Sequence, residues 1–422
     1  MAKVSKGSNG TGDGAAGDNI RLAEVGQSLF VKAAGIGIVA LGISAVLGAG
    51  EHDGWNRFSH SYLVAFAWMM TIGAGALWWV TIQNIVNSHW STVIRRVAEL
   101  IASNAPMLAL LALPIVIPLI IGRSDMYLWS DVNRMLGHEE LKHKIPYLNT
   151  KFFAIRFVFY FGFWTVLSYF FLNRSTGQDS EAEATAAKTV VTMRRVAGPA
   201  MIVFALTITF CAIDLIMSLD PRWFSTMFGV YYFASCVLAI NSSLALTLMW
   251  LQSKGRLTSS VTVHHFHDLG KMVFAFTVFW AYIGFSQFML LWYANIPEET
   301  LWFKDRFVNS WGTLSWVLLF GHFVIPFFGL LSRWVKRNRK ALAFWCCWQL
   351  VMIYLDMYWL VMPTLEVDGK PVREVPFQII DLTCWIGVLS LFIAALAYRA
   401  KGRELLAKND PRLPKSLAFE NI

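Results

Sequence analysis

The stretch AIDLIMSLDPRWFSTMFG, residues 212–229, contains the features that decide the fold. An apolar run ends at an Asp-Pro pair, and a second apolar run begins after it. Asp220 before Pro221 is typical of a helix N-cap followed by proline in the first turn. Asp214 lies about 9 Å further inside the first run, at a rise of about 1.5 Å per residue. We therefore predict two long helices that meet at a bilayer surface, with a carboxylate inside the first.

The composition extends this prediction to the whole chain. Of 422 residues, 56% are hydrophobic and only 15% are charged, whereas soluble proteins carry about 25% charged residues. The apolar runs have the length needed to cross a bilayer core of about 30 Å, and no alternating strand pattern competes with helices. We predict an all-α integral membrane protein with ten transmembrane helices, at residues 28–49, 58–86, 97–122, 149–172, 195–219, 222–250, 269–294, 308–332, 341–362 and 380–400.

Short strings repeat at a distance of four helices. Asp214 and Pro221 are separated by six residues, as are Asp356 and Pro363. The strings FG and LNR at 161–174 likewise match FG and LSR at 320–333. A shift of four spans preserves orientation, so we predict two parallel-related four-helix bundles, helices 2–5 and helices 6–9, flanked by helices 1 and 10. Chance matching in a biased composition is the alternative.

These elements divide the chain into five regions. We expect a flexible cytoplasmic tail, helix 1 with its outer loop, the first bundle, the second bundle, and a last region with an outer loop, helix 10 and a cytoplasmic tail. Their predicted boundaries are 1–27, 28–57, 58–219, 220–362 and 363–422.

The net charge of +9 does not indicate nucleic-acid binding, because the basic residues occupy short loops between apolar runs. The amino-terminal tail, the even-numbered connections and the carboxyl terminus carry roughly twice as many Lys and Arg residues as the odd-numbered connections. This distribution predicts a multi-pass protein with both termini in the cytoplasm.

The sequence offers no redox centre. The five cysteines lie within apolar runs, without the C-x-x-C or C-x-x-C-H spacings of iron–sulfur or haem sites. No metal-ligand spacing, phosphate loop or nucleophile elbow occurs either. We therefore expect no metal and no covalently bound cofactor, and no complete enzyme in this chain alone.

Ionisable residues inside the spans are the candidate functional residues, because a charge in a bilayer is costly and usually faces a cavity or a partner. Asp214 and Asp356 lie at matching depths, His322 lies near the middle of its helix, and Glu99 lies near the cytoplasmic side. Together they could form a proton path. The alternative for each is a hydrogen bond that packs helices together.

Two further sets are weaker candidates. His60 lies close to the outer surface and, with Asp214, could neighbour a quinone. The string HHFHDLGK at 264–271 could collect protons at His264, His265, His267 and Asp268, or hold a metal; more simply, Asp268 caps a helix. Arg156 near a span end is expected to extend towards the interface.

Three stretches carry a resemblance to a known family. IDLIMSLDPRWFSTMFG (213–229), with ten spans in two bundles, resembles the NrfD-type membrane subunits of polysulfide reductases. FSHSYLVAFAWMMTIGAGALWWVTIQNIVNSHWSTVIRRVAE (58–99) and HHFHDLGKMVFAFTVFWAYIGFSQFMLLWYANIPEET (264–300) are similar to the ActF subunits of bacterial alternative complex III, paralogues of ActC. The resemblance covers nearly the whole chain except its two ends.

The resemblance implies a subunit of a menaquinol-oxidising respiratory complex in the bacterial cytoplasmic membrane, which passes electrons to cytochrome c or to an oxidase. Expected partners are an ActC-like paralogue, a multihaem cytochrome c subunit, an iron–sulfur and molybdopterin-like subunit, a terminal oxidase and lipid, with haems and iron–sulfur clusters on those subunits. The chain would act as a scaffold and contribute a menaquinone site or a proton path. The residues alone also allow an autonomous secondary transporter or a purely structural anchor.

Overall fold

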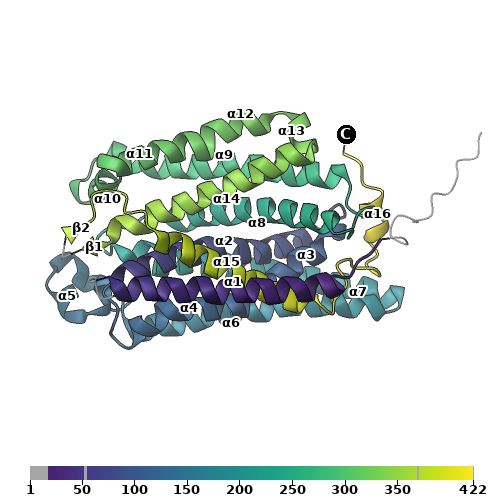
Figure 1. Ribbon diagram of the computed structural model, residues 1–422, viewed down its shortest axis with the longest axis horizontal. Coiled ribbons are helices and arrows are strands. Elements are labelled where there is room, and N and C mark those ends of the chain that lie inside the picture. Colours follow the sequence, from purple (N-terminus) through teal and green to yellow (C-terminus); the bar gives the residue numbers. More distant parts are fainter. Residues whose placement is uncertain (1–17, 52–54, 368–369, 422) are drawn as a thin grey trace, which may run out of the picture.

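The computed structural model describes residues 18–51, 55–367 and 370–421. Within these ranges the chain is almost entirely helical, and ten of its helical segments are long and apolar enough to cross a membrane. These segments lie roughly side by side along the long axis (Figure 1). The prediction of an all-α membrane protein with ten spans is confirmed.

Five spans are single helices, namely α1 (Ala23–Gly50), α2 (Asn56–Ile85), α8 (Phe228–Ser253), α9 (Val263–Ala294) and α15 (Ile379–Ala400). Three are helices followed by a short 3-10 turn, namely α6 (Thr150–Gly177) with η3 (Gln178–Ser180), α7 (Glu183–Leu215) with η4 (Met217–Leu219) and α14 (Arg339–Val361) with η6 (Met362–Thr364). Two are built from separate pieces, namely α3 (Thr92–Ala102) with α4 (Ala105–Ile120), and α11 (Asn309–Val317) with η5 (Leu318–Val324) and α12 (Ile325–Leu331).

Short elements occupy the two ends of the bundle. One end holds η1 (Leu128–Ser130), α5 (Val132–Leu136), η2 (Glu139–Lys144), α10 (Pro297–Phe307), η6 (Met362–Thr364) and the hairpin of β1 (Glu366–Val367) and β2 (Lys370–Pro371). The other end holds α13 (Arg333–Arg337) and α16 (Leu413–Leu417) (Figure 1). The carboxyl terminus and the start of α1 lie at this second end, which is referred to below as the tail end.

Helix α2 is the centre of the molecule. Its most apolar window is entirely buried by protein, and it packs against α3, α4, α7, α8, α14 and α15. A helix that is apolar on all sides, as α2 is, belongs in such a position. By contrast, α1 exposes many apolar side chains and packs mainly on α15.

Small residues allow the closest helix contacts. A Cβ on Gly75 would lie 2.3 Å from the carbonyl oxygen of Cys236, so α2 and α8 approach each other with almost no space between their backbones. Gly37 of α1 and Gly387 of α15 face each other's helices in the same way. Such small-residue contacts replace the hydrophobic driving force that is absent within lipid.

The remaining contacts link helices both within and between the two predicted groups. Helices α2, α3, α4, α6 and α7 contact one another, and so do α8, α9, α12, α13 and α14 with the π-helical η5. The two groups meet chiefly where α2 and α7 pack on α8 and where α2 packs on α14. The parallel relation between the two groups stays a prediction.

Three local predictions are wrong. Helix α8 begins at Phe228, so Asp220 caps no helix; its carboxylate instead accepts hydrogen bonds from the backbone and side chain of Arg222. The third span is broken at residues 103–104, just before Pro106. The predicted flexible tail extends too far, because α1 already starts at Ala23 and residues 18–22 are hydrogen-bonded to the rest of the chain; residues 1–17 of that tail lie outside the described part.

Candidate functional site

Asp214 is neutralised by an arginine. Its side chain is 1% exposed, and Arg156 of α6 grips both of its oxygens, with Nε–Oδ2 and Nη2–Oδ1 distances of 2.8 and 2.9 Å. The hydroxyl of Tyr160 donates a further hydrogen bond of 2.9 Å to Oδ2. The guanidinium also lies over the ring of Tyr147, 3.9 Å from its centroid. This two-point ion pair fixes α6 to α7, and the expectation that Arg156 extends to the interface is wrong.

Asp356 has a different environment. It is fully buried in α14, where the hydroxyl of Tyr231 donates to Oδ1 at 2.5 Å and the indole of Trp280 donates to Oδ2 at 3.2 Å. No cation forms an ion pair with Asp356 among the residues that the structure describes. Two neutral donors stabilise a carboxylate less than a guanidinium does. Within the described part of the chain, Asp356 therefore lacks a charged partner such as the one that Asp214 has.

The repeated sequence motif thus leads to two unlike sites. Asp214 takes its side-chain partners from α6, the preceding span, whereas Asp356 takes its partners from α8 and α9. Equal spacing from a proline preserves the position of the carboxylate along its helix but not its neighbours. The pair does not act as two equivalent stations in this geometry.

His322 lies beside the Asp356 site. The histidine is fully buried in the π-helical segment η5, and its ring lies over Trp280 with centroids 3.9 Å apart. Neither ring nitrogen has a hydrogen-bond partner within the described part of the chain. Since Trp280 contacts both Asp356 and His322, the structure brings these two predicted residues together around one indole.

A buried amide extends this group across the helices. The Nε2 atom of Gln349 donates to the hydroxyl of Thr277 at 2.8 Å and to the backbone carbonyl of His322 at 3.3 Å. A π-helical segment such as η5 leaves backbone carbonyls displaced from the regular ladder, and such segments often occur at functional sites. We refer to Asp356, Tyr231, Trp280, His322 and Gln349 as the Trp280 cluster.

Glu99 belongs to a separate ionic network at the tail end. Its carboxylate lies 3.0 Å from Nε of Arg95 and 3.4 Å from Nε of Arg96, and all three side chains are buried. Arg95 also binds Asp410 of the carboxyl-terminal segment at 2.5 Å, and Asp410 in turn binds Arg412. Glu99 therefore helps attach the carboxyl-terminal segment, and it shares no hydrogen bond or ion pair with the Trp280 cluster.

The network shifts the pKa of both Asp410 and Arg412. Burial alone would raise the pKa of Asp410, but the charges of Arg95 and Arg412 and their hydrogen bonds hold it well below its usual range. Burial and the neighbouring Arg95 lower the pKa of Arg412. Buried charges need partners of opposite charge such as these to be tolerated.

His60 lies at the opposite end from Glu99, in the first turn of α2. It is 1% exposed, and its Nδ1 atom lies 2.9 Å from the carbonyl of Asn56 and its Nε2 atom 3.4 Å from the hydroxyl of Thr364. Asp214 contacts neither of these residues, and its oxygens are occupied by Arg156 and Tyr160. The two residues share no hydrogen bond within the described part of the chain, and a quinone near them stays a prediction.

The histidines at 264–267 serve as docking points for the carboxyl terminus. Helix α9 begins at Val263 and is capped by Thr262 with His265, so the prediction that Asp268 caps a helix is wrong. His264 accepts from the backbone N–H of Asn421, and His265 lies 3.2 Å from the carbonyl of Ser416. Asp268 contacts Lys271 and the side chain of Asn421.

The remaining histidine of this string is His267, which was predicted to take part in proton entry. His267 is 5% exposed, and its Nδ1 atom has no partner within the residues described. In that same part of the chain, no group of three or more His, Cys, Asp or Glu side chains could hold a metal ion.

Several side chains that bind the candidate residues were not predicted from the sequence. Arg156 and Asp214 lie at similar depths near the same ends of consecutive spans, and this match could have paired them. Tyr231 and Trp280 gave no signal, because aromatic residues are abundant in all spans. A similar buried pair joins Arg57 to Asp381 at 2.7 Å, where α2 meets the start of α15.

Comparison with known proteins identifies no relative: no protein-family model matches the chain, and no curated protein matches it at a significant level.

Proposed function

We propose that this chain is an integral membrane subunit of a quinol-oxidising respiratory complex, similar to the ActF subunits of alternative complex III. The support comes from the resemblance of residues 58–99, 213–229 and 264–300 to that family. The ten apolar helical segments are compatible with such a subunit. In this role the chain supports the complex in the bacterial cytoplasmic membrane with both termini inside, while haems and iron–sulfur clusters belong to partner subunits.

The Trp280 cluster is the observation that carries a role beyond scaffolding. It contains a buried carboxylate that pairs with no cation among the described residues and accepts from the N–H of one indole, and a buried histidine whose ring lies over the face of that indole. Buried carboxylates and imidazoles of this kind exchange protons in membrane proteins. We therefore assign the proposed proton path to Asp356 and His322, and we assign Asp214 and Glu99 to structural ion pairs.

Purification from native membranes in mild detergent tests the assignment to a complex. The expected result is co-purification with a multihaem cytochrome and an iron–sulfur subunit. A chain that is recovered intact without such partners would overturn the assignment.

Two substitutions separate a proton path from a structural anchor. Asp356→Asn keeps the size of the side chain but removes its exchangeable acid, so we expect an assembled complex with reduced quinol oxidation or proton movement; Asp356→Glu should restore part of it. The matched substitution Asp214→Asn should affect stability more than turnover, since Arg156 loses its charged partner. Full activity of the assembled Asp356→Asn complex would contradict the proton path and leave a purely structural anchor as the role of the chain.

A secondary transporter is the second candidate, and two features favour it. The third span is interrupted at residues 103–104, and the eighth contains the π-helical segment η5. Broken helices at membrane depth often surround substrate sites in transporters. Solute uptake by the purified chain alone in liposomes would support this function over the first.

A further inference from the structure

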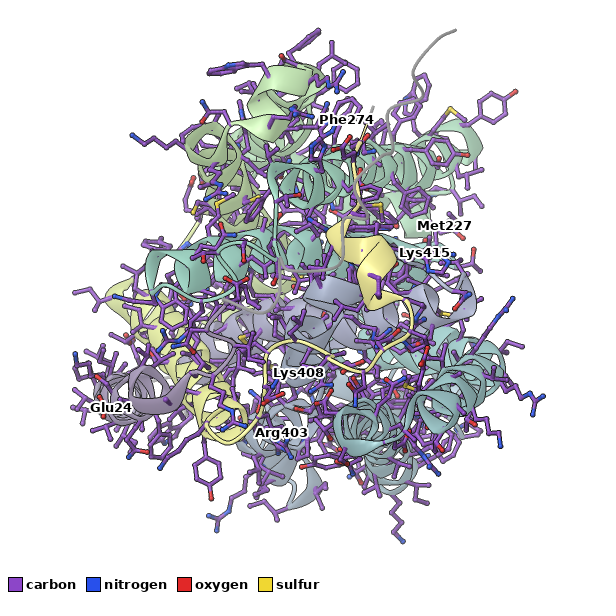
Figure 2. The ribbon with its side chains drawn as sticks, turned by 90° about the vertical axis from the view of Figure 1, so that its right-hand side faces the viewer. Glu24, Met227, Phe274, Arg403, Lys408 and Lys415 are labelled. Carbon is purple, nitrogen blue, oxygen red and sulfur yellow. The ribbon has the colours of Figure 1, made fainter. Side chains whose placement is uncertain are left out.

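A cavity of about 300 Å³ opens at the tail end, beside the Glu99 network. It lies where the end of α6 meets the segment that follows α15. Figure 2 looks onto this end, where the labelled Arg403 and Lys408 both lie along the carboxyl-terminal segment. The lining residues are Arg96, Thr176, Asp179, Ser180, Gly402, Arg403, Glu404 and Lys408.

The two carboxylates of the lining already have cationic partners. Arg96 binds Asp179 through two hydrogen bonds of 2.9 and 3.1 Å. Glu404 accepts from Arg21 at 2.9 Å and from Lys408 at 2.8 Å. Neither carboxylate is therefore left to balance further positive charge at the cavity.

Two further arginines, Arg399 and Arg403, add positive charge at or beside the cavity. Arg403 donates to the backbone carbonyl of Arg399 at 3.0 Å, and Arg399 donates to the hydroxyl of Tyr169 at 2.6 Å. Neither arginine takes part in any ion pair formed by the residues that the structure describes. Burial and then the charges of Arg399 and Arg96 lower the pKa of Arg403. Like charges thus lie close together at a half-buried position without an acidic counterpart.

The position along the helix axis identifies the kind of anion. Arg399 is in the last turn of the span α15, and Arg403 follows that span directly. This is the level at which lipid head groups lie. Tyr398, next to Arg399, is 67% exposed, and Val166 of α6 is 70% exposed, so apolar surface that acyl chains can cover lies nearby on both helices.

We propose that Arg403, which lines the cavity, and Arg399, four residues before it, bind the phosphate of an anionic phospholipid whose head group lies at the mouth of the cavity. Guanidinium groups match the geometry of phosphate oxygens, and basic pockets at the ends of membrane helices bind acidic head groups. The bound lipid supplies the negative charge that the protein lacks here. It also connects α15 and the carboxyl-terminal segment to the lipid leaflet on this side.

The test uses the purified full chain in detergent, titrated with phosphatidylglycerol and, in parallel, with phosphatidylcholine. Binding is followed by native mass spectrometry and by the shift in melting temperature. We expect phosphatidylglycerol to bind more tightly than phosphatidylcholine. The double variant Arg399→Gln/Arg403→Gln should weaken phosphatidylglycerol binding at least about tenfold, because each charged hydrogen bond contributes about that factor.

Control substitutions assign the effect to this cavity. Arg194→Gln removes an exposed cation of α7 away from the lining and should leave the affinity unchanged. Arg399→Lys/Arg403→Lys should retain more binding than the glutamine pair. If the glutamine variant does not fold, crosslinking of a photoactivatable phosphatidylglycerol to the native chain replaces it, and label outside residues 396–408 and α6 would overturn the proposal.

Other outcomes also overturn the proposal. Equal affinity for the two lipids, or an unchanged affinity in a folded glutamine variant, would show that no acidic head group binds here. An equal stabilisation by inorganic phosphate would assign the site to a free anion rather than to a lipid.

Discussion

The substitution Arg156→Gln should destabilise the protein strongly. It removes two hydrogen bonds of 2.8 and 2.9 Å from Asp214, whose side chain is 1% exposed, and leaves that carboxylate with Tyr160 alone. Removing one partner of a buried ion pair costs about 3–5 kcal/mol in soluble proteins. Interhelical hydrogen bonds in membranes contribute less, with an average of about 0.6 kcal/mol. We therefore expect a loss of about 3 kcal/mol, at the lower end of the first range.

The double variant Arg156→Leu/Asp214→Leu should lose much less stability. Replacing a buried ion pair by apolar residues of similar size is often neutral, because no unpaired charge remains. The single variants Arg156→Leu and Asp214→Leu form a cycle with this double variant, and its coupling energy should be about 2 kcal/mol or more. Arg222→Gln serves as a control, because it breaks a pair in which the arginine is 61% exposed and should cost about 0–1 kcal/mol.

Unfolding in mixed detergent and dodecyl sulfate micelles measures these energies. The 19 tryptophans of the chain provide the fluorescence signal. A cost of Arg156→Gln no larger than that of Arg222→Gln, or a coupling energy near zero, would refute the role given to this pair.

The other predictions concern different parts of the fold. Asp356→Asn should cost only about 1 kcal/mol in the same unfolding assay, because no cation loses its partner and Tyr231 can still donate; a loss as large as that of Arg156→Gln would contradict this. The pKa of Asp410 is held below its usual range, so its stabilisation is present above the unfolded pKa of about 3.9 and is lost as pH falls through the lower folded pKa. Limited proteolysis of residues 401–412 should therefore not change between about pH 8 and pH 5 in the native protein, whereas Asp410→Asn should be cleaved faster there throughout; pH-dependent cleavage of these residues in the native chain would be inconsistent with the network. Cys347 is exposed and the other four cysteines are buried, so N-ethylmaleimide should modify Cys347 first in the detergent-solubilised protein, as peptide mass spectrometry can show.

The sequence was sufficient to predict where the helices lie in the chain, but not which helices pack against each other. Length and apolarity identify a span without knowledge of the rest of the fold, and this is why ten spans were predicted within a few residues at most boundaries. The exceptions have local causes. Residues 222–227 precede α8 and are not helical despite the Asp-Pro signal. The break before Pro106 falls at Ser103 and Asn104, between the two apolar halves of the third span.

The candidate site could be predicted only as a set of residue types. Asp214 and Asp356 share spacing and depth, yet one faces Arg156 and the other faces Tyr231 and Trp280. Which helix faces which is set by tertiary packing, such as the close approach of α2 and α8 at Gly75. A single sequence carries no record of these contacts, so the separation of a structural ion pair from the Trp280 cluster required the structure.

The pair of Arg95 and Asp410 has a consequence for biosynthesis. The two residues are 315 positions apart in the chain, so the ribosome has produced nearly the whole protein before Arg95 can meet Asp410. Until then Glu99, one turn along α3, and Asp179, at the end of the next span, supply the early counter-charges of this network. The last residues to be synthesised complete it, so a chain that stops short of residue 410 would leave Arg95 without its partner Asp410.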